Sequence, residues 1–278
     1  MNENLKMKVE ASIELLKRGE RLALALDAEH GYYLAFSGGK DSQCLLELAK
    51  MAGVKFTPIY AVTGIDSPVN VKFIEKHYPQ VKFVYPKENY FRLIEKKGLP
   101  LIRTRFCCER LKERLMSGTV LLDGVRWAES RKRAEYKSVA VRSRRKENIE
   151  RGRYRDLAEL ESNEHRCIKG KDRIDMHPIL PWSTDDVWEF IHERGLPINP
   201  CYSSVSRVGC MYCPFASKEQ IELFEREYPL YRKRLILSLQ RFLAKHPIEG
   251  ILSAEDYLEF WKSKKTLKAY ISSRINVV

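Results

Sequence analysis

The chain lacks any apolar run long enough to cross a membrane. Its first residues, Met1–Lys6, also lack the apolar stretch and small-residue cleavage site of a signal peptide. We therefore expect a cytoplasmic protein with no membrane partner. No internal repeat is present, and a hydrophobic content of 44% over 278 residues is enough for a sizeable core.

Acidic residues are in short supply. The chain has 37 of them against 50 lysines and arginines, a formal charge of +13 that indicates an anionic partner. The excess is concentrated between Arg126 and Arg155, which suggests three interpretations: DNA or RNA binding, binding of small phosphates and sulfates, or a solvated surface. The basic residues between these two ends are Arg131, Lys132, Arg133, Lys137, Arg142, Arg144, Arg145, Lys146, Arg151 and Arg153.

The cysteines do not form the even, regularly spaced set of a disulfide framework. There are seven, and in a cytoplasmic protein they indicate metal ligands or reactive thiols. An adjacent pair, Cys107 and Cys108, and a C-x-x-C pair, Cys210 and Cys213, together supply four sulfur ligands. An adjacent pair suits an iron–sulfur cluster better than a zinc ion, although zinc and free thiols remain alternatives. Cys44 is expected to be a buried filler in an apolar helix.

Strands alternate with helices over the first half of the chain, which predicts an α/β fold with a parallel sheet covered on both faces. We expect residues 37–42, 63–68 and 124–133, which follow strands, to converge on one crevice. Residues 142–176 have few aliphatic side chains and are expected to be irregular. The predicted strands are 32–36, 55–62, 81–85 and 119–123, and the predicted helices include 6–18, 69–77 and 90–97.

The segment Ser37-Gly38-Gly39-Lys40-Asp41-Ser42 joins the first predicted strand to a helix. Its glycines allow an anion to approach the backbone, and the amides of the new helix point at that anion. Lys40 adds a mobile positive charge, and Ser37 and Ser42 add hydroxyl donors. The spacing is not that of a Walker A loop. It resembles the PP-loop of the ATP pyrophosphatases, which implies cleavage of ATP between its α- and β-phosphates.

Further motifs in the same order along the chain extend the resemblance over residues 30 to 215. They are Thr63-Gly64 with Pro68, Cys107-Cys108, Gly124-x-Arg126-x-x-Glu129-Ser130, Trp182-Ser183-x-x-Asp186-Val187-Trp188, and Tyr202 ahead of Gly209-Cys210-x-x-Cys213. The combination is similar to the phosphoadenosine phosphosulfate reductase family, and its cysteine set resembles the 4Fe-4S ligands of the adenylylsulfate reductases.

The resemblance implies a PP-loop fold, a doubly wound sheet of the adenine nucleotide alpha hydrolase type, over residues 1–215, followed by a helical extension over 216–278. It implies an adenine nucleotide with Mg²⁺, and a cluster bound by the four cysteines beside it. Lys40, Asp41, Arg126 and Arg133 are the expected catalytic residues. Ser37–Ser42, Thr63, Gly64, Gly124 and Arg126 are the expected nucleotide-binding residues.

Two departures from the reductase pattern shift the expected reaction. No cysteine follows Cys213, whereas the reductases carry a nucleophilic cysteine in a C-terminal Glu-Cys-Gly motif, and the phosphate loop here is intact. The chain also resembles the PP-loop component of DNA phosphorothioation systems. We expect an enzyme that cleaves ATP to AMP and pyrophosphate and activates an acceptor for sulfur transfer, with a sulfur- or electron-donor protein as a further partner. The alternatives are a sulfonucleotide reductase using Cys201 or an external thiol, and a nucleic-acid-binding module with a structural metal.

Overall fold

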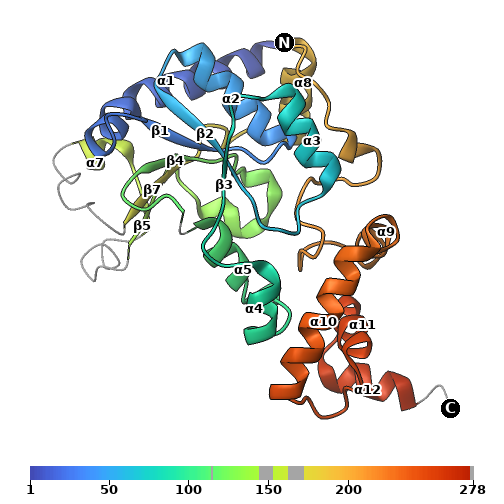
Figure 1. Cartoon of the computed structure of the whole chain (residues 1–278). Helices are drawn as coiled ribbons and strands as arrows, with labels where there is room; N and C mark the ends of the chain where they lie inside the picture. The colour runs from blue at the N-terminus through green and yellow to red at the C-terminus, as the bar shows by residue number, and fades with distance from the viewer. Residues whose placement is uncertain (114, 144–152, 162–171, 276–278) are drawn as a thin grey trace. The chain divides into compact units, whose positions relative to one another are not determined.

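The computed structural model describes residues 1–113, 115–143, 153–161 and 172–275 (Figure 1). The chain forms two compact units, each assembled from separate stretches of sequence. The first comprises Met1–Ala61, Pro68–Val84 and Arg114–Val208, and the second comprises Val62–Ser67, Tyr85–Glu113 and Gly209–Val278. The boundary expected at residue 215 stays a prediction. Within the described residues, no helix is both long enough and apolar enough to span a membrane.

The first unit is built on a seven-stranded sheet with the order β3-β2-β1-β4-β7-β5-β6. Five strands run parallel, and β5 is antiparallel to both β6 and β7. The α/β architecture with a mainly parallel sheet is confirmed, and the antiparallel edge is an addition to it. The strands are β1 (Tyr32–Ala35), β2 (Phe56–Ala61), β3 (Lys82–Val84), β4 (Val120–Leu122), β5 (Val139–Arg142), β6 (Tyr154–Arg155) and β7 (Arg173–Met176).

The helices of this unit cover the sheet by their apolar faces. The first of them, α1, is longer than predicted because Leu22 and Ala23 continue the buried stripe of Leu5, Val9 and Leu16. It packs against α2, which in turn packs against α8. The helices are α1 (Glu3–Leu26), α2 (Lys40–Ala52), α3 (Pro68–His77), α7 (Leu157–Glu161) and α8 (Thr184–Glu193), with short 3₁₀ turns η2 (Trp127–Glu129), η3 (Arg131–Glu135) and η5 (Pro200–Ser203).

The expectation that residues 142–176 are irregular is wrong for the part that the structure describes, because β6, α7 and β7 lie within it. All four residues of β7 are buried, yet two of them are charged. Arg173 donates a 2.6 Å hydrogen bond to Asp175, which is fully buried. Such a strand has no apolar periodicity, so the sequence pattern did not reveal it.

The second unit is helical within the described residues. Its helices are α4 (Tyr90–Lys97), α5 (Phe106–Cys108), α9 (Lys218–Glu227), α10 (Pro229–Lys245), α11 (Ala254–Ser263) and α12 (Leu267–Ile275), with a π-helical turn η1 (Glu109–Glu113) after α5. The longest, α10, packs against α4 and α11. Its buried residues include Leu235, Leu239 and Phe242. The predicted helix 90–97 is confirmed with the same bounds.

Candidate functional site

The phosphate loop connects β1 to α2 at the point where the strand order reverses, between β1 and β4. In open α/β sheets, ligands bind at such a switch point. Gly38 has φ = +75°, and a Cβ on it would lie 2.4 Å from Asn70 Oδ1. Only glycine fits this position, and it brings the bare backbone to the start of α2.

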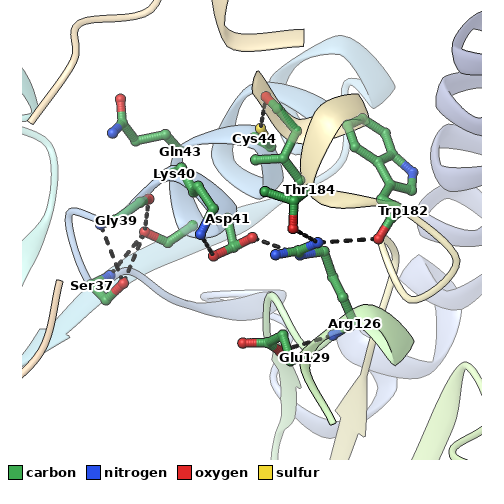
Figure 2. A network of polar contacts seen from close by, with 12 residues as sticks. Ser37, Gly39, Lys40, Asp41, Gln43, Cys44, Arg126, Glu129, Trp182 and Thr184 are labelled. Carbon is green, nitrogen blue, oxygen red and sulfur yellow. Dashed lines mark hydrogen bonds and ion pairs between the residues drawn. The ribbon is translucent and has the colours of Figure 1, made fainter. Parts of the chain in front are cut away.

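Serine hydroxyls hold the loop closed on itself (Figure 2). Ser42 Oγ donates to the Gly39 carbonyl at 2.8 Å and accepts from the Ser37 backbone N–H at 3.1 Å. The hydroxyls of Ser37 and Ser42 are 3.2 Å apart and hydrogen-bonded. Side chains from outside the loop bind its carbonyls, with Asn70 donating to Ser37 and Asn199 to Gly38. These contacts fix the shape of the loop at the start of α2, the end of a helix where an anion is favoured.

The charged residues of the loop meet the segment that follows β4. Arg126 Nε donates to Asp41 Oδ1 at 2.7 Å, and Lys40 Nζ donates to Asp41 Oδ2 at 3.3 Å (Figure 2). Arg126 is only 2% exposed, and its Nη1 donates to the Trp182 carbonyl at 3.2 Å and to Thr184 at 3.5 Å. Two cations, Lys40 and Arg126, and one carboxylate, Asp41, therefore lie together where the phosphate loop joins α2.

Gly124 explains how the two segments come so close. A Cβ on it would lie 3.0 Å from the Cβ of Asp41, so a side chain here would press on the loop. Of the three segments expected to converge, residues 37–42 and 124–133 thus meet. The convergence of residues 63–68 with them stays a prediction, because Val62–Ser67 belongs to the second unit. Arg133 lies in η3, where it forms an ion pair with Glu129. Its role in anion binding stays a prediction, as do those of the other loop residues.

The four predicted cysteine ligands line one pocket in the second unit. Cys107 and Cys108 come from α5, and the Cys210–Cys213 segment is aligned by an antiparallel bridge between Asp66 and Cys210. The other residues that line the pocket are Thr63, Ile65, Tyr90, Leu111, Lys112, Tyr212 and Pro214. Two cysteine pairs that are distant in sequence therefore line one pocket. Their role as ligands of a shared metal or cluster stays a prediction.

The electrostatics of this pocket favour a thiolate at Cys108. A hydrogen bond from the Cys107 thiol, together with the charges of Lys112 and Arg105, lowers the pKa of Cys108 to about 6, while the pKa of Cys107 is raised. Burial raises the pKa of Cys210 against the opposing effect of Lys112. The Cys210 thiolate is in turn the main cause of a raised pKa for Lys112. A buried ammonium thus faces a group of sulfur ligands.

Thr63, predicted to bind nucleotide, belongs to this pocket. Its hydroxyl lies 3.6 Å from Cys210 Sγ and donates to Asp66 at 2.8 Å. Gly64 has φ = +80° and donates its N–H to Asp66 at 3.2 Å. Their contact with a nucleotide stays a prediction. Across residues 1–113, 115–143, 153–161 and 172–275, no three His, Cys, Asp or Glu side chains are arranged so as to hold a single metal ion.

The remaining cysteines lie away from the pocket or outside the described residues. Cys44 is fully buried, and its thiol donates to the Val187 carbonyl at 3.6 Å, which confirms the predicted filler role. Cys201 is half-buried in η5. Cys167 lies outside the described residues.

A buried Asp–His pair beside the Arg126 segment was missed by the sequence analysis. His177 Nδ1 lies 2.6 Å from Asp123 Oδ1, and within the described residues His177 Nε2 has no hydrogen-bond partner. Burial acts to raise the pKa of Asp123, but His177 and the Val125 N–H outweigh it, and the pKa is lowered. The available signal was the position of Asp123 at the end of a strand, one residue before Gly124.

The basic segment does not form a single exposed surface. Arg142 forms an ion pair with the buried Asp175, and Arg155 is 2% exposed within the sheet unit. Both therefore serve the fold. Arg144, Arg145, Lys146 and Arg151 lie outside the described residues. Polynucleotide binding by this segment stays a prediction, now without Arg142 and Arg155.

The family assignment agrees with the geometry of the loop and the pocket. Residues 31–216 match the phosphoadenosine phosphosulfate reductase domain, and the chain belongs to this family. Two uncharacterized proteins of Methanocaldococcus jannaschii are each 27% identical to it, over 84% and 83% of the chain. The chain spans about half the length of these curated relatives, 46% and 51%.

Two solved structures of other enzymes are among those to which the chain is similar. A phosphoadenylyl-sulfate reductase from Candida auris is 15% identical with a TM-score of 0.44, covering 76% of this chain and 96% of its own. The U34-tRNA thiolase NcsA from Methanococcus maripaludis, with its [4Fe-4S] cluster, is 16% identical with a TM-score of 0.40, covering 93% and 82%.

Proposed function

We propose that this member of the phosphoadenosine phosphosulfate reductase family cleaves ATP to AMP and pyrophosphate and so activates an acceptor for sulfur transfer. The observation that carries the proposal is the complete, pre-formed phosphate loop with Lys40 and Arg126 at its mouth. A loop whose carbonyls are already bound by Asn70 and Asn199 presents its amides and cations, the groups that an anionic phosphate needs.

In the proposed reaction, an acceptor oxygen attacks the α-phosphorus of ATP, and the bond from this phosphorus to the oxygen bridging to the β-phosphorus breaks. The acceptor carries AMP, and pyrophosphate leaves with the bridging oxygen. Lys40 Nζ and the amides that follow Lys40 at the start of α2 stabilise the charge that develops on pyrophosphate. Arg126 and Arg133 are proposed to bind oxygens of the same nucleotide.

Asp41 is the residue proposed to hold Mg²⁺, whose chemistry is to neutralise phosphate charge. Its carboxylate now accepts hydrogen bonds from Arg126 and Lys40. We propose that both cations transfer to phosphate oxygens when the nucleotide and Mg²⁺ arrive. The exchange replaces each ion pair by another, so no charge is left buried without a partner.

The cysteine pocket fits an iron–sulfur cluster. Four sulfur ligands from two segments line one cavity, with the buried Lys112 beside them to balance negative charge. Cys107, Cys108, Cys210 and Cys213 would hold the cluster, with zinc as the alternative occupant. When bound, the cluster supplies one-electron chemistry or an iron that binds sulfur.

A product assay on protein purified without oxygen tests the proposal against the reductase alternative, which the family match favours. With ATP, Mg²⁺ and a sulfur source, we expect pyrophosphate, together with AMP because water takes the place of the acceptor oxygen when no acceptor is supplied. With adenylylsulfate or its 3′-phosphorylated form and a thiol, we expect no sulfite. Sulfite release without pyrophosphate formation would favour the reductase, and neither product would contradict both.

A further inference from the structure

The phenol of Tyr202, a residue of η5, contacts the phosphate loop at the start of α2. Its Oη accepts a 2.8 Å hydrogen bond from the backbone N–H of Lys40, the first residue of α2. A Cβ placed on Gly39 would lie 3.3 Å from the same oxygen. In the part of the chain that the structure describes, Oη has no acceptor for its own proton. A free O–H donor therefore stands at the start of the helix, where a phosphate would bind.

The segment that carries Tyr202 is anchored to the loop. Asn199 is fully buried, and its Nδ2 donates to the Gly38 carbonyl at 2.8 Å and to Asn70 Oδ1 at 2.7 Å. Its Oδ1 accepts from the Cys201 N–H and caps η5. The Tyr202 ring packs edge-on against Trp188, with centroids 5.2 Å apart. These contacts hold the hydroxyl in one place before any ligand arrives.

We propose that Tyr202 is a phosphate ligand, which keeps the hydrogen bond from the Lys40 amide and donates its own proton to an oxygen of the pyrophosphoryl group. The proposal rests on the ATP-binding function proposed above. A hydroxyl that accepts from a helix-terminal N–H is polarised and becomes a better donor, and a charged acceptor strengthens the bond further. Lys40 Nζ lies 5.9 Å from the centre of the Tyr202 ring, so both groups can reach the same anion.

The protonation state of the phenol agrees with a donor role. Burial raises the pKa of Tyr202 to about 12, so the hydroxyl keeps its proton at neutral pH. The opposite interpretation is that Tyr202 only occupies the Lys40 amide until phosphate displaces it. The two interpretations predict opposite effects of removing the hydroxyl. Removing a donor weakens phosphate binding, whereas removing a competitor leaves it unchanged or strengthens it.

Calorimetric titration with inorganic pyrophosphate, with α,β-methylene ATP and with AMP, each in Mg²⁺, separates these cases. We expect Tyr202→Phe to weaken binding of pyrophosphate and of the ATP analogue about 10- to 100-fold, the range for a hydrogen bond to a charged group. AMP should bind as it does to the wild type. Tyr33→Phe is the matched control, because Tyr33 lies on β1 and its hydroxyl donates to Asp27.

Pyrophosphate binding to Tyr202→Phe that equals or exceeds the wild type would overturn the donor role. If pyrophosphate binding is weakened in Tyr202→Ala but not in Tyr202→Phe, only the aromatic ring contributes to binding, and the donor role is overturned equally. If the wild type binds neither pyrophosphate nor the analogue, the proposed function fails and this inference fails with it. Should Tyr202→Phe not fold, 3-fluorotyrosine at position 202 keeps the hydroxyl, and an unchanged ¹⁹F shift on saturation with pyrophosphate would contradict the contact.

Discussion

Arg126 donates a 2.7 Å hydrogen bond to Asp41 although 85 residues separate them in the chain. The contact joins the segments that follow β1 and β4, the two strands at the point where the sheet order reverses. It places a buried cation against the phosphate loop, so Arg126 supports the fold there in addition to the nucleotide-binding role proposed for it.

Replacing Arg126 by lysine keeps the positive charge but removes the planar guanidinium, which donates to Asp41 and to the Trp182 carbonyl at the same time. We expect the unfolding free energy to fall by about 1–3 kcal/mol, because buried acceptors lose their donor. ATP turnover should fall at least about 10-fold, the effect of one charge-assisted hydrogen bond. Urea unfolding and a pyrophosphate assay measure the two effects. The exposed Arg131→Lys should change neither, and an Arg126→Lys variant with wild-type turnover would contradict the role.

Asp123 should make a pH-dependent contribution to stability through His177. Its lowered pKa in the folded state means that its contribution is complete above the unfolded value of about 3.9 and disappears as the pH falls through the folded value. Asp123→Asn should therefore cost about 1–3 kcal/mol at pH 6–8 and progressively less below about pH 4. Urea unfolding of both proteins across this range tests the sign. A cost that grows on acidification would show that the interaction is wrongly assigned.

Serine substitutions test the cysteine pocket. Cys107→Ser and Cys210→Ser, made and reconstituted without oxygen, should lose most of the iron, acid-labile sulfide and visible absorbance of the wild type. Cys201→Ser is the control, because Cys201 lies in the first unit and does not line the pocket. Zinc in place of iron would reject the cluster but keep the four-sulfur site. Loss of metal in the control alone would reject the site.

The prediction that the basic segment binds nucleic acid can be tested on Arg144 and Arg145, which lie outside the described residues. If the segment binds DNA or RNA, affinity should fall steeply with salt. Arg144→Ala with Arg145→Ala should reduce the slope of log K against log[salt] by about 0.9 for each duplex phosphate that the variant no longer neutralises. Arg142 is left unchanged, because its ion pair with Asp175 supports the sheet. If the protein binds no polynucleotide at low salt, nucleic acid is not a partner of this segment.

The sequence predicted the parts of the molecule whose buried residues are apolar or whose functional residues form a motif. Apolar runs indicated β1 to β4. The grouping of Cys107 and Cys108 with Cys210 and Cys213 agrees with the pocket that all four line, and their role as ligands stays a prediction.

What the sequence did not reveal depends on buried polar contacts between distant segments. Arg173 and Asp175 sit in a buried strand as an ion pair, so no apolar pattern marks β7. His177 belongs to none of the sequence motifs, and its partner Asp123 lies at the end of another strand. Tyr202 appeared only as part of a motif, and its contact with the Lys40 amide depends on how η5 is anchored.

The central claim is that the loop binds ATP and directs cleavage between the α- and β-phosphates. The most direct measurement is ³¹P NMR of the products formed from ATP and Mg²⁺ by wild type, Lys40→Ala and Lys50→Ala, the last being a half-exposed lysine at the end of the same helix. We expect AMP and pyrophosphate from the wild type and Lys50→Ala, and roughly 100-fold slower formation by Lys40→Ala. ADP and phosphate as products, or a Lys40→Ala variant as fast as the wild type, would contradict the account.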